Sequence, residues 1–154
     1  MIKRVFIAAA LIAMASPAAA DFANGWDAYL KQDYATARQE WQPLAESGDA
    51  KAQYAIGIVY AKGQGVEQNF AEAVRWFTSA AEQGNPNARY LLGYMYRLGQ
   101  GVERDPVKAY MWFDLAAGGG LASAAQARDL LADDMSADQI AAAQALIEAD
   151  RGGD

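Results

Sequence analysis

The chain has 154 residues, of which 19 are acidic and 13 basic, so its formal net charge is −6 at pH 7, and it contains neither cysteine nor histidine. The lack of cysteine excludes disulfide bonds, thiolate metal sites and cysteine nucleophiles, and the lack of histidine removes the commonest general base and metal ligand. An acidic chain repels phosphate backbones, so we expect no nucleic-acid partner.

The first twenty residues have the pattern of a secretory signal peptide. A short basic start precedes an apolar run over Val5 to Ala15, and small residues follow as far as Ala20. The run is too short to cross a hydrocarbon core, which needs about 20 residues. We therefore expect cleavage before Asp21, secretion into a bacterial periplasm, a mature net charge of about −8 and no transmembrane segment in the mature chain.

A half-repeat over residues 22–48 is predicted next. Its first helix covers about 22–31. Its second helix contains Ala37, Trp41, Ala45 and Gly48, and three of these, Ala37, Ala45 and Gly48, stand in register with small residues of the units that follow. The first helix lacks the glycine-rich loop that those later units carry.

The central part of the chain repeats itself after 36 residues. The stretch Ala52-x-Tyr54-x-x-Gly57-x-x-Tyr60-x-x-Gly63-Gln64-Gly65-Val66-Glu67 recurs as Ala88-x-Tyr90-x-x-Gly93-x-x-Tyr96-x-x-Gly99-Gln100-Gly101-Val102-Glu103. The residues Ala73, Trp76, Phe77, Ala80, Ala81 and Gly84 recur as Ala109, Trp112, Phe113, Ala116, Ala117 and Gly120. This duplication predicts two full repeats, at 49–84 and 85–120.

Each full repeat is predicted to be a pair of helices, at about 50–62 and 70–83, and again at 87–98 and 106–117. Asn69 and Asp105 stand where a side chain can cap the second helix, Pro106 suits a first helical turn, and Gly84 and Gly120 follow the helix end. No single pair can bury its apolar face, so stacking is expected.

Glycine inside a helix costs about 1 kcal/mol relative to alanine, so Gly57 and Gly93 need a structural reason. We expect them to allow close approach of the paired helix, against alanines at 73, 80, 109 and 116. The bulky residues expected in the core are Trp26, Trp41, Trp76 and Trp112, together with Tyr60 and Tyr96.

The C-terminal part, 121–150, is predicted to hold a half-repeat and a capping helix. A first helix is expected over 121–131. Ser136 and Gln139 form a capping-box pattern that opens a last helix through Ala149. The repeat domain thus covers 21–150, the tail 151–154 is expected to be disordered, and no strand is predicted.

The pattern Ala-x-Tyr-x-x-Gly-x-x-Tyr-x-x-Gly-x-Gly-Val, followed by Ala-x-x-Trp-Phe-x-x-Ala-Ala-x-x-Gly, resembles the Sel-one-like repeat family, a relative of the tetratricopeptide repeats. The resemblance implies an all-α, right-handed solenoid of antiparallel helix pairs that serves as an interaction platform. One subgroup of the family was linked to β-lactamase activity, but that subgroup is rich in cysteine, which this chain lacks.

Catalytic and cofactor motifs are missing from the sequence. It has no Gly-x-Ser-x-Gly elbow and no Ser-x-x-Lys pair. The glycine loops at 63–65 and 99–101 lack the Lys-Ser/Thr of phosphate loops and are better explained as turns. The pair Asp133-Asp134 lacks the spacing of a calcium loop. We therefore predict no catalytic residue, no metal and no cofactor.

A binding surface is predicted on the concave side, which the first helices of such solenoids line. By helical phase, the residues that project there are Lys51, Tyr54, Ile58 and Lys62 from one unit, and Asn87, Tyr90, Tyr94 and Arg97 from the next. Tyrosines beside Lys or Arg can anchor a peptide. The leading hypothesis is a secreted or periplasmic scaffold for a protein or peptide. The alternatives are a cell-envelope hydrolase, β-lactamase-like or directed at peptidoglycan, and a glycan-binding accessory protein.

Overall fold

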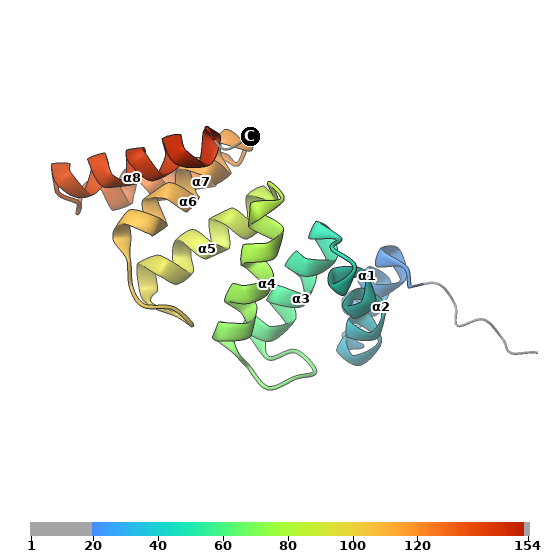
Figure 1. Cartoon of the computed structure of the whole chain (residues 1–154). Helices are drawn as coiled ribbons and strands as arrows, with labels where there is room; N and C mark the ends of the chain where they lie inside the picture. Colours follow the sequence, from blue (N-terminus) through green and yellow to red (C-terminus); the bar gives the residue numbers. More distant parts are fainter. Residues whose placement is uncertain (1–19, 153–154) are drawn as a thin grey trace, which may run out of the picture.

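A computed structural model describes residues 20–152, and within that range it contains eight α-helices and no β-strand (Figure 1). The helices are α1 (Phe22–Leu30), α2 (Tyr34–Glu46), α3 (Ala50–Lys62), α4 (Phe70–Glu82), α5 (Pro86–Leu98), α6 (Pro106–Gly118), α7 (Ala122–Ala132) and α8 (Ala137–Arg151). The predicted signal peptide, except for Ala20, lies outside the described residues. None of the described helices is long and apolar enough to cross a membrane.

The helices stack in chain order as a solenoid. Within the repeats, α1 packs on α2, α3 on α4 and α5 on α6, and neighbouring pairs meet where α2 contacts α3, α4 contacts α5 and α6 contacts α7. In Figure 1 the pairs follow one another from α1 at one end to α8 at the other. The predicted all-α solenoid is therefore confirmed.

The helix ends follow the predicted local chemistry. Asn69 accepts a hydrogen bond from the backbone N–H of Glu72 at 3.0 Å, and Asp105 accepts from those of Val107 and Lys108 at 3.0 and 3.1 Å. Ser136 and Gln139 form the expected capping box. The glycines Gly84 and Gly120, after the second helices, have φ of +88° and +93°, which a side chain would disfavour.

Asp105→Ala is expected to lower the free energy of unfolding by about 1 kcal/mol, because two backbone N–H groups at the start of α6 would lose their acceptor. Urea denaturation measures this difference. Asp105→Asn keeps a capping oxygen and is the matched control. Equal destabilisation by both substitutions would mean that the carboxylate charge, and not the cap, stabilises the helix.

A glycine lies beneath a large aromatic ring in three successive helix pairs. A methyl group added to Gly57 would overlap the ring of Phe77, one added to Gly93 would overlap Phe113, and one added to Gly25 would overlap Trp41. The expected close approach is confirmed, but its partner is an aromatic ring and not the predicted alanines. The N-terminal pair keeps the same contact although its loop is shorter.

The core aromatics differ from the predicted set. Trp41 is 1% exposed, as expected, whereas Trp26 is 48% exposed and Trp76 and Trp112 are only half-buried. Tyr60 and Tyr96 are half-buried as well. In α4 and α6 the next residue, Phe77 or Phe113, is the one that points at the glycine. Adjacent residues of a helix point about 100° apart, so only one of each Trp-Phe pair can occupy that position.

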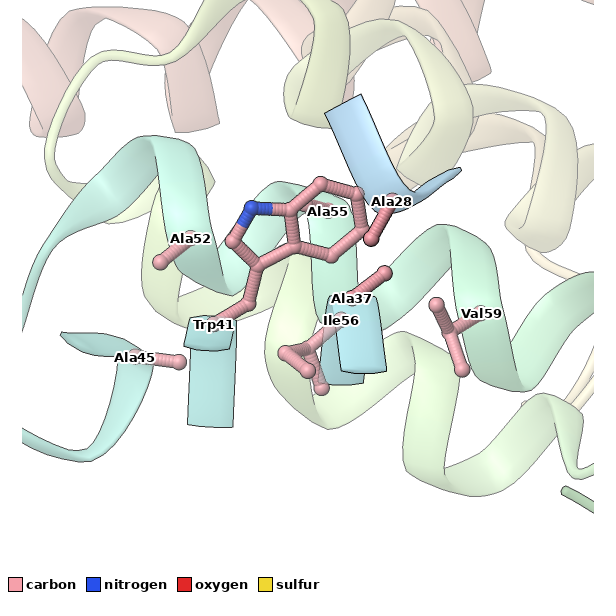
Figure 2. Close-up of a cluster of buried hydrophobic side chains, with 8 residues drawn as sticks. All are labelled: Ala28, Ala37, Trp41, Ala45, Ala52, Ala55, Ile56 and Val59. Carbon is pink, nitrogen blue, oxygen red and sulfur yellow. The ribbon is translucent and has the colours of Figure 1, made fainter. Parts of the chain in front are cut away.

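Small side chains make room for the large buried ones. Ala28, Ala37, Ala45, Ala52 and Ala55 share a cluster with Trp41, Ile56 and Val59. Figure 2 shows the Trp41 indole among these alanine side chains. The alanine-rich composition of the repeats therefore lets neighbouring helices close tightly around one large ring per pair.

The last helix closes the stack differently from the others, because α8 packs against α6 instead of pairing with α7. It buries Ala143 and Ile147 there. Asp114 of α6 accepts hydrogen bonds from Arg128 at 2.7 Å and from Arg151 at 3.2 Å, so one carboxylate joins α6, α7 and α8. Arg151 is thus the last residue of α8 and does not belong to the disordered tail predicted for 151–154, of which 153–154 lie outside the described residues.

Candidate functional site

An apolar groove with a volume of about 510 Å³ opens between α1 and α3. The residues that line it are Phe22, Trp26, Tyr29, Trp41, Tyr54, Ala55, Ile58 and Lys62. Five of these side chains are aromatic and one, Lys62, is charged. Grooves with mostly apolar walls and few polar groups are typical of binding sites for peptides and small molecules.

Helical spacing explains how the sequence builds the two walls. Tyr54, Ile58 and Lys62 follow one another at four-residue intervals on α3, so they form one stripe along its surface. Phe22 and Trp26 have the same spacing on α1. These two stripes face the shared groove.

The aromatic rings of the α1 wall are held against the core. Trp26 stacks on Tyr29, with 5.6 Å between ring centroids and 13° between planes, and Tyr29 in turn lies 5.6 Å from Trp41. The indole N–H of buried Trp41 donates to the backbone carbonyl of Phe22 at 3.1 Å. Because Trp26 stacks on Tyr29 and is still 48% exposed, it presents a large apolar surface at the groove.

The polar end of the groove is tied to a glycine-rich loop. The Tyr29 hydroxyl donates to Oε1 of Gln64 at 2.9 Å, and Nζ of Lys62 donates to the Tyr29 hydroxyl at 3.4 Å. Burial raises the pKa of Tyr54 above its ordinary value of 10.0, so its phenol is neutral at physiological pH. The ammonium of Lys62 is therefore the only charge at the lining of the groove.

Of the eight predicted binding residues, three line the groove and five do not. Tyr54, Ile58 and Lys62 lie together in the groove. Lys51 is exposed near the start of α3 and is not in the lining, and Asn87 is exposed at the start of α5.

The remaining three predicted residues gather around Phe113. Tyr90 and Tyr94 lie 5.8 and 5.1 Å from the ring of Phe113, their hydroxyls are 3.3 Å apart, and the guanidinium of Arg97 lies 6.0 Å from the Tyr94 ring. Tyr94 meets the Phe113 ring edge-on. Its half-buried ring helps to cover the core.

Sequence reasoning missed the α1 half of the groove. Phe22, Trp26 and Tyr29 were assigned to a degenerate first helix, and Trp26 to the core. The signal in the sequence is the four-residue spacing of Phe22 and Trp26, which matches that of Tyr54 and Ile58 on α3. Elsewhere in residues 20–152, no group of three or more acidic side chains is placed to hold a metal ion.

Two segments of the chain, residues 50–85 and 86–121, match the family model of the Sel1 repeat. This chain is a Sel1 repeat protein. The matched segments contain α3 with α4 and α5 with α6, together with the glycine-rich loops that connect them.

Solved structures of other Sel1 repeat proteins resemble this one. A protective antigen present in uropathogenic Escherichia coli strains shares 29% identity with a TM-score of 0.78, over 82% of this chain and 28% of the antigen. A Sel1 repeat protein from Oxalobacter formigenes shares 32% identity with a TM-score of 0.69, over 72% of this chain and 46% of that protein. This Sel1 repeat protein therefore spans less than half the length of either structure. No curated protein matches it.

Proposed function

We propose that this Sel1 repeat protein is a secreted or periplasmic scaffold that binds a segment of another protein in the groove between α1 and α3. The observation that carries the proposal is the exposure of Trp26. Its side chain is 48% exposed at the groove and stacks on Tyr29, which packs against buried Trp41. Exposed aromatic anchors in apolar clefts account for much of the binding energy at protein interfaces. The signal-peptide pattern at the N-terminus supports the extracytoplasmic location.

The groove chemistry favours binding over catalysis. Its lining offers aromatic and aliphatic carbon, two phenols and one ammonium, and it includes no carboxylate, serine or threonine. A hydrolytic site needs a nucleophile and a base within hydrogen-bond reach of each other, or a metal-activated water. The hydrolase alternative therefore has less support here than the scaffold.

Site-specific photo-crosslinking in cells that naturally produce the protein tests the scaffold proposal. A crosslinking residue at Ile58, in the groove wall, is expected to yield a discrete protein adduct. The same residue at exposed Glu148 of α8 is the control and is expected to yield none. Introducing Trp26→Ala into the Ile58 protein should abolish the adduct, because the aromatic anchor is gone while Trp41 and the core stay in place.

An adduct that persists with Trp26→Ala, or that forms equally from Glu148, would contradict binding in this groove. Crosslinking to peptidoglycan or another glycan, in place of protein, would instead favour the glycan-binding alternative, because stacked aromatic rings also bind sugars. Thermal unfolding of Trp26→Ala, measured by circular dichroism, confirms that any loss of the adduct does not come from unfolding.

A further inference from the structure

We infer that the segment bound in the groove is acidic as well as apolar: a bulky aliphatic or aromatic side chain enters between α1 and α3, and a neighbouring carboxylate meets Lys62. This inference rests on the proposed function and specifies the chemistry of the partner. It is carried by how charge is distributed over the helices and by the surroundings of Lys62.

Charge is sorted by helix in this solenoid. The first helices of the two full repeats, α3 and α5, contain Lys51, Lys62, Arg89 and Arg97 and no acidic residue. The helices α2, α4, α6 and α8 each contain at least one carboxylate. The chain as a whole has 19 acidic and 13 basic residues. α3 and α5 are therefore net positive in an otherwise acidic protein, whereas α1, the other wall of the groove, contains Asp27.

Lys62 is the cation of this face that stands at the groove. Within residues 20–152, no carboxylate lies within 4.0 Å of its ammonium, whose one hydrogen bond is to the Tyr29 hydroxyl. Arg89, by contrast, is committed to the backbone carbonyls of Ala81 and Leu115. The Lys62 ammonium thus lies at the lining of the groove and forms no ion pair with a described residue.

Electrostatic complementarity selects partners more strongly than it adds affinity. An apolar segment could pack against the walls of the groove, and a carboxylate on it, placed toward the C-terminal end of α3, could form an ion pair with the Lys62 ammonium. A basic segment would meet Lys62 with like charge and would be rejected.

Selection from displayed random peptides tests this inference with three forms of the purified protein: the unmodified chain, Lys62→Glu and Trp26→Ala. The unmodified chain is expected to enrich peptides that combine aromatic or aliphatic residues with Asp or Glu. Lys62→Glu should enrich Lys or Arg beside the same apolar residues. Peptides selected on the unmodified chain should lose about tenfold in affinity for Lys62→Glu, and their binding should weaken with added salt.

The outcomes separate the inference from the function on which it rests. One outcome is that the selected peptides are apolar and need Trp26, but have the same charge composition on the unmodified chain and on Lys62→Glu. This outcome would contradict the inference of an acidic partner and would still support the scaffold function. Peptides whose binding is indifferent to Trp26→Ala, or no enrichment at all, would overturn both. Lys62 is exposed and its one hydrogen bond within the described residues, to the Tyr29 hydroxyl, is long at 3.4 Å, so Lys62→Glu should melt like the unmodified protein.

Discussion

Phe113→Ala is expected to lower the free energy of unfolding by about 3–5 kcal/mol. The ring of Phe113 is 0% exposed and fills the space above Gly93, between α5 and α6. Tyr90 and Tyr94 pack against the same ring and would lose their support. Removing the ring therefore leaves a cavity that the rigid helix pair closes poorly.

Chemical denaturation of Phe113→Ala and of Trp112→Ala, followed by circular dichroism, checks this expectation. Trp112 is the adjacent residue of α6 but is only half-buried, so its loss should cost clearly less. A larger effect from Trp112→Ala than from Phe113→Ala would mean that the indole, and not the phenyl ring, is the central aromatic of the pair.

Gly93→Ala is expected to lower the free energy of unfolding by about 1 kcal/mol, although alanine is normally the better helix residue by about 1 kcal/mol. The new methyl group would overlap the Phe113 ring, which has no free space to enter. Overpacking of this kind costs about 1–3 kcal/mol, which exceeds the gain in helix propensity.

Gly118→Ala is the matched control for Gly93→Ala. Gly118 also lies in a helix, at the end of α6, and a methyl group there would meet no atom within 4 Å. Its substitution should therefore leave stability unchanged or raise it. Combining Gly93→Ala with Phe113→Leu should cost less than the sum of the two single changes, because the smaller side chain relieves the overlap. Additive costs would show that the glycine and the ring do not share this contact.

Much of the fold follows from local sequence. The duplication after 36 residues, the capping residues Asn69 and Asp105, and the glycines after the helices located most helix ends within a residue or two. These signals are local, since a cap or a left-handed residue acts on its own turn of the chain. The packing of α8 on α6 has no local signal, because it depends on which apolar surface remains open at the end of the stack.

The site was less predictable than the fold. Helical phase alone places Tyr54, Ile58 and Lys62 on one stripe of α3, and all three line the groove. Trp26 was assigned to the core because a large aromatic residue is usually buried, but it is 48% exposed at the groove. A groove between two helices depends on their relative placement, which periodicity within either helix does not contain.

The four tryptophans allow a direct test of the central claim, that the groove between α1 and α3 is the binding site. The indole N–H resonances of Trp26, Trp41, Trp76 and Trp112 can be followed by NMR while the segment captured at Ile58 is added. Of the four, only Trp26 and Trp41 line the groove. We predict a large shift for Trp26, a smaller one for Trp41, whose N–H is already bonded to Phe22, and none for Trp76 and Trp112. An unchanged Trp26 resonance beside a shifted Trp76 or Trp112 would contradict the claim and place the binding site on the second helices.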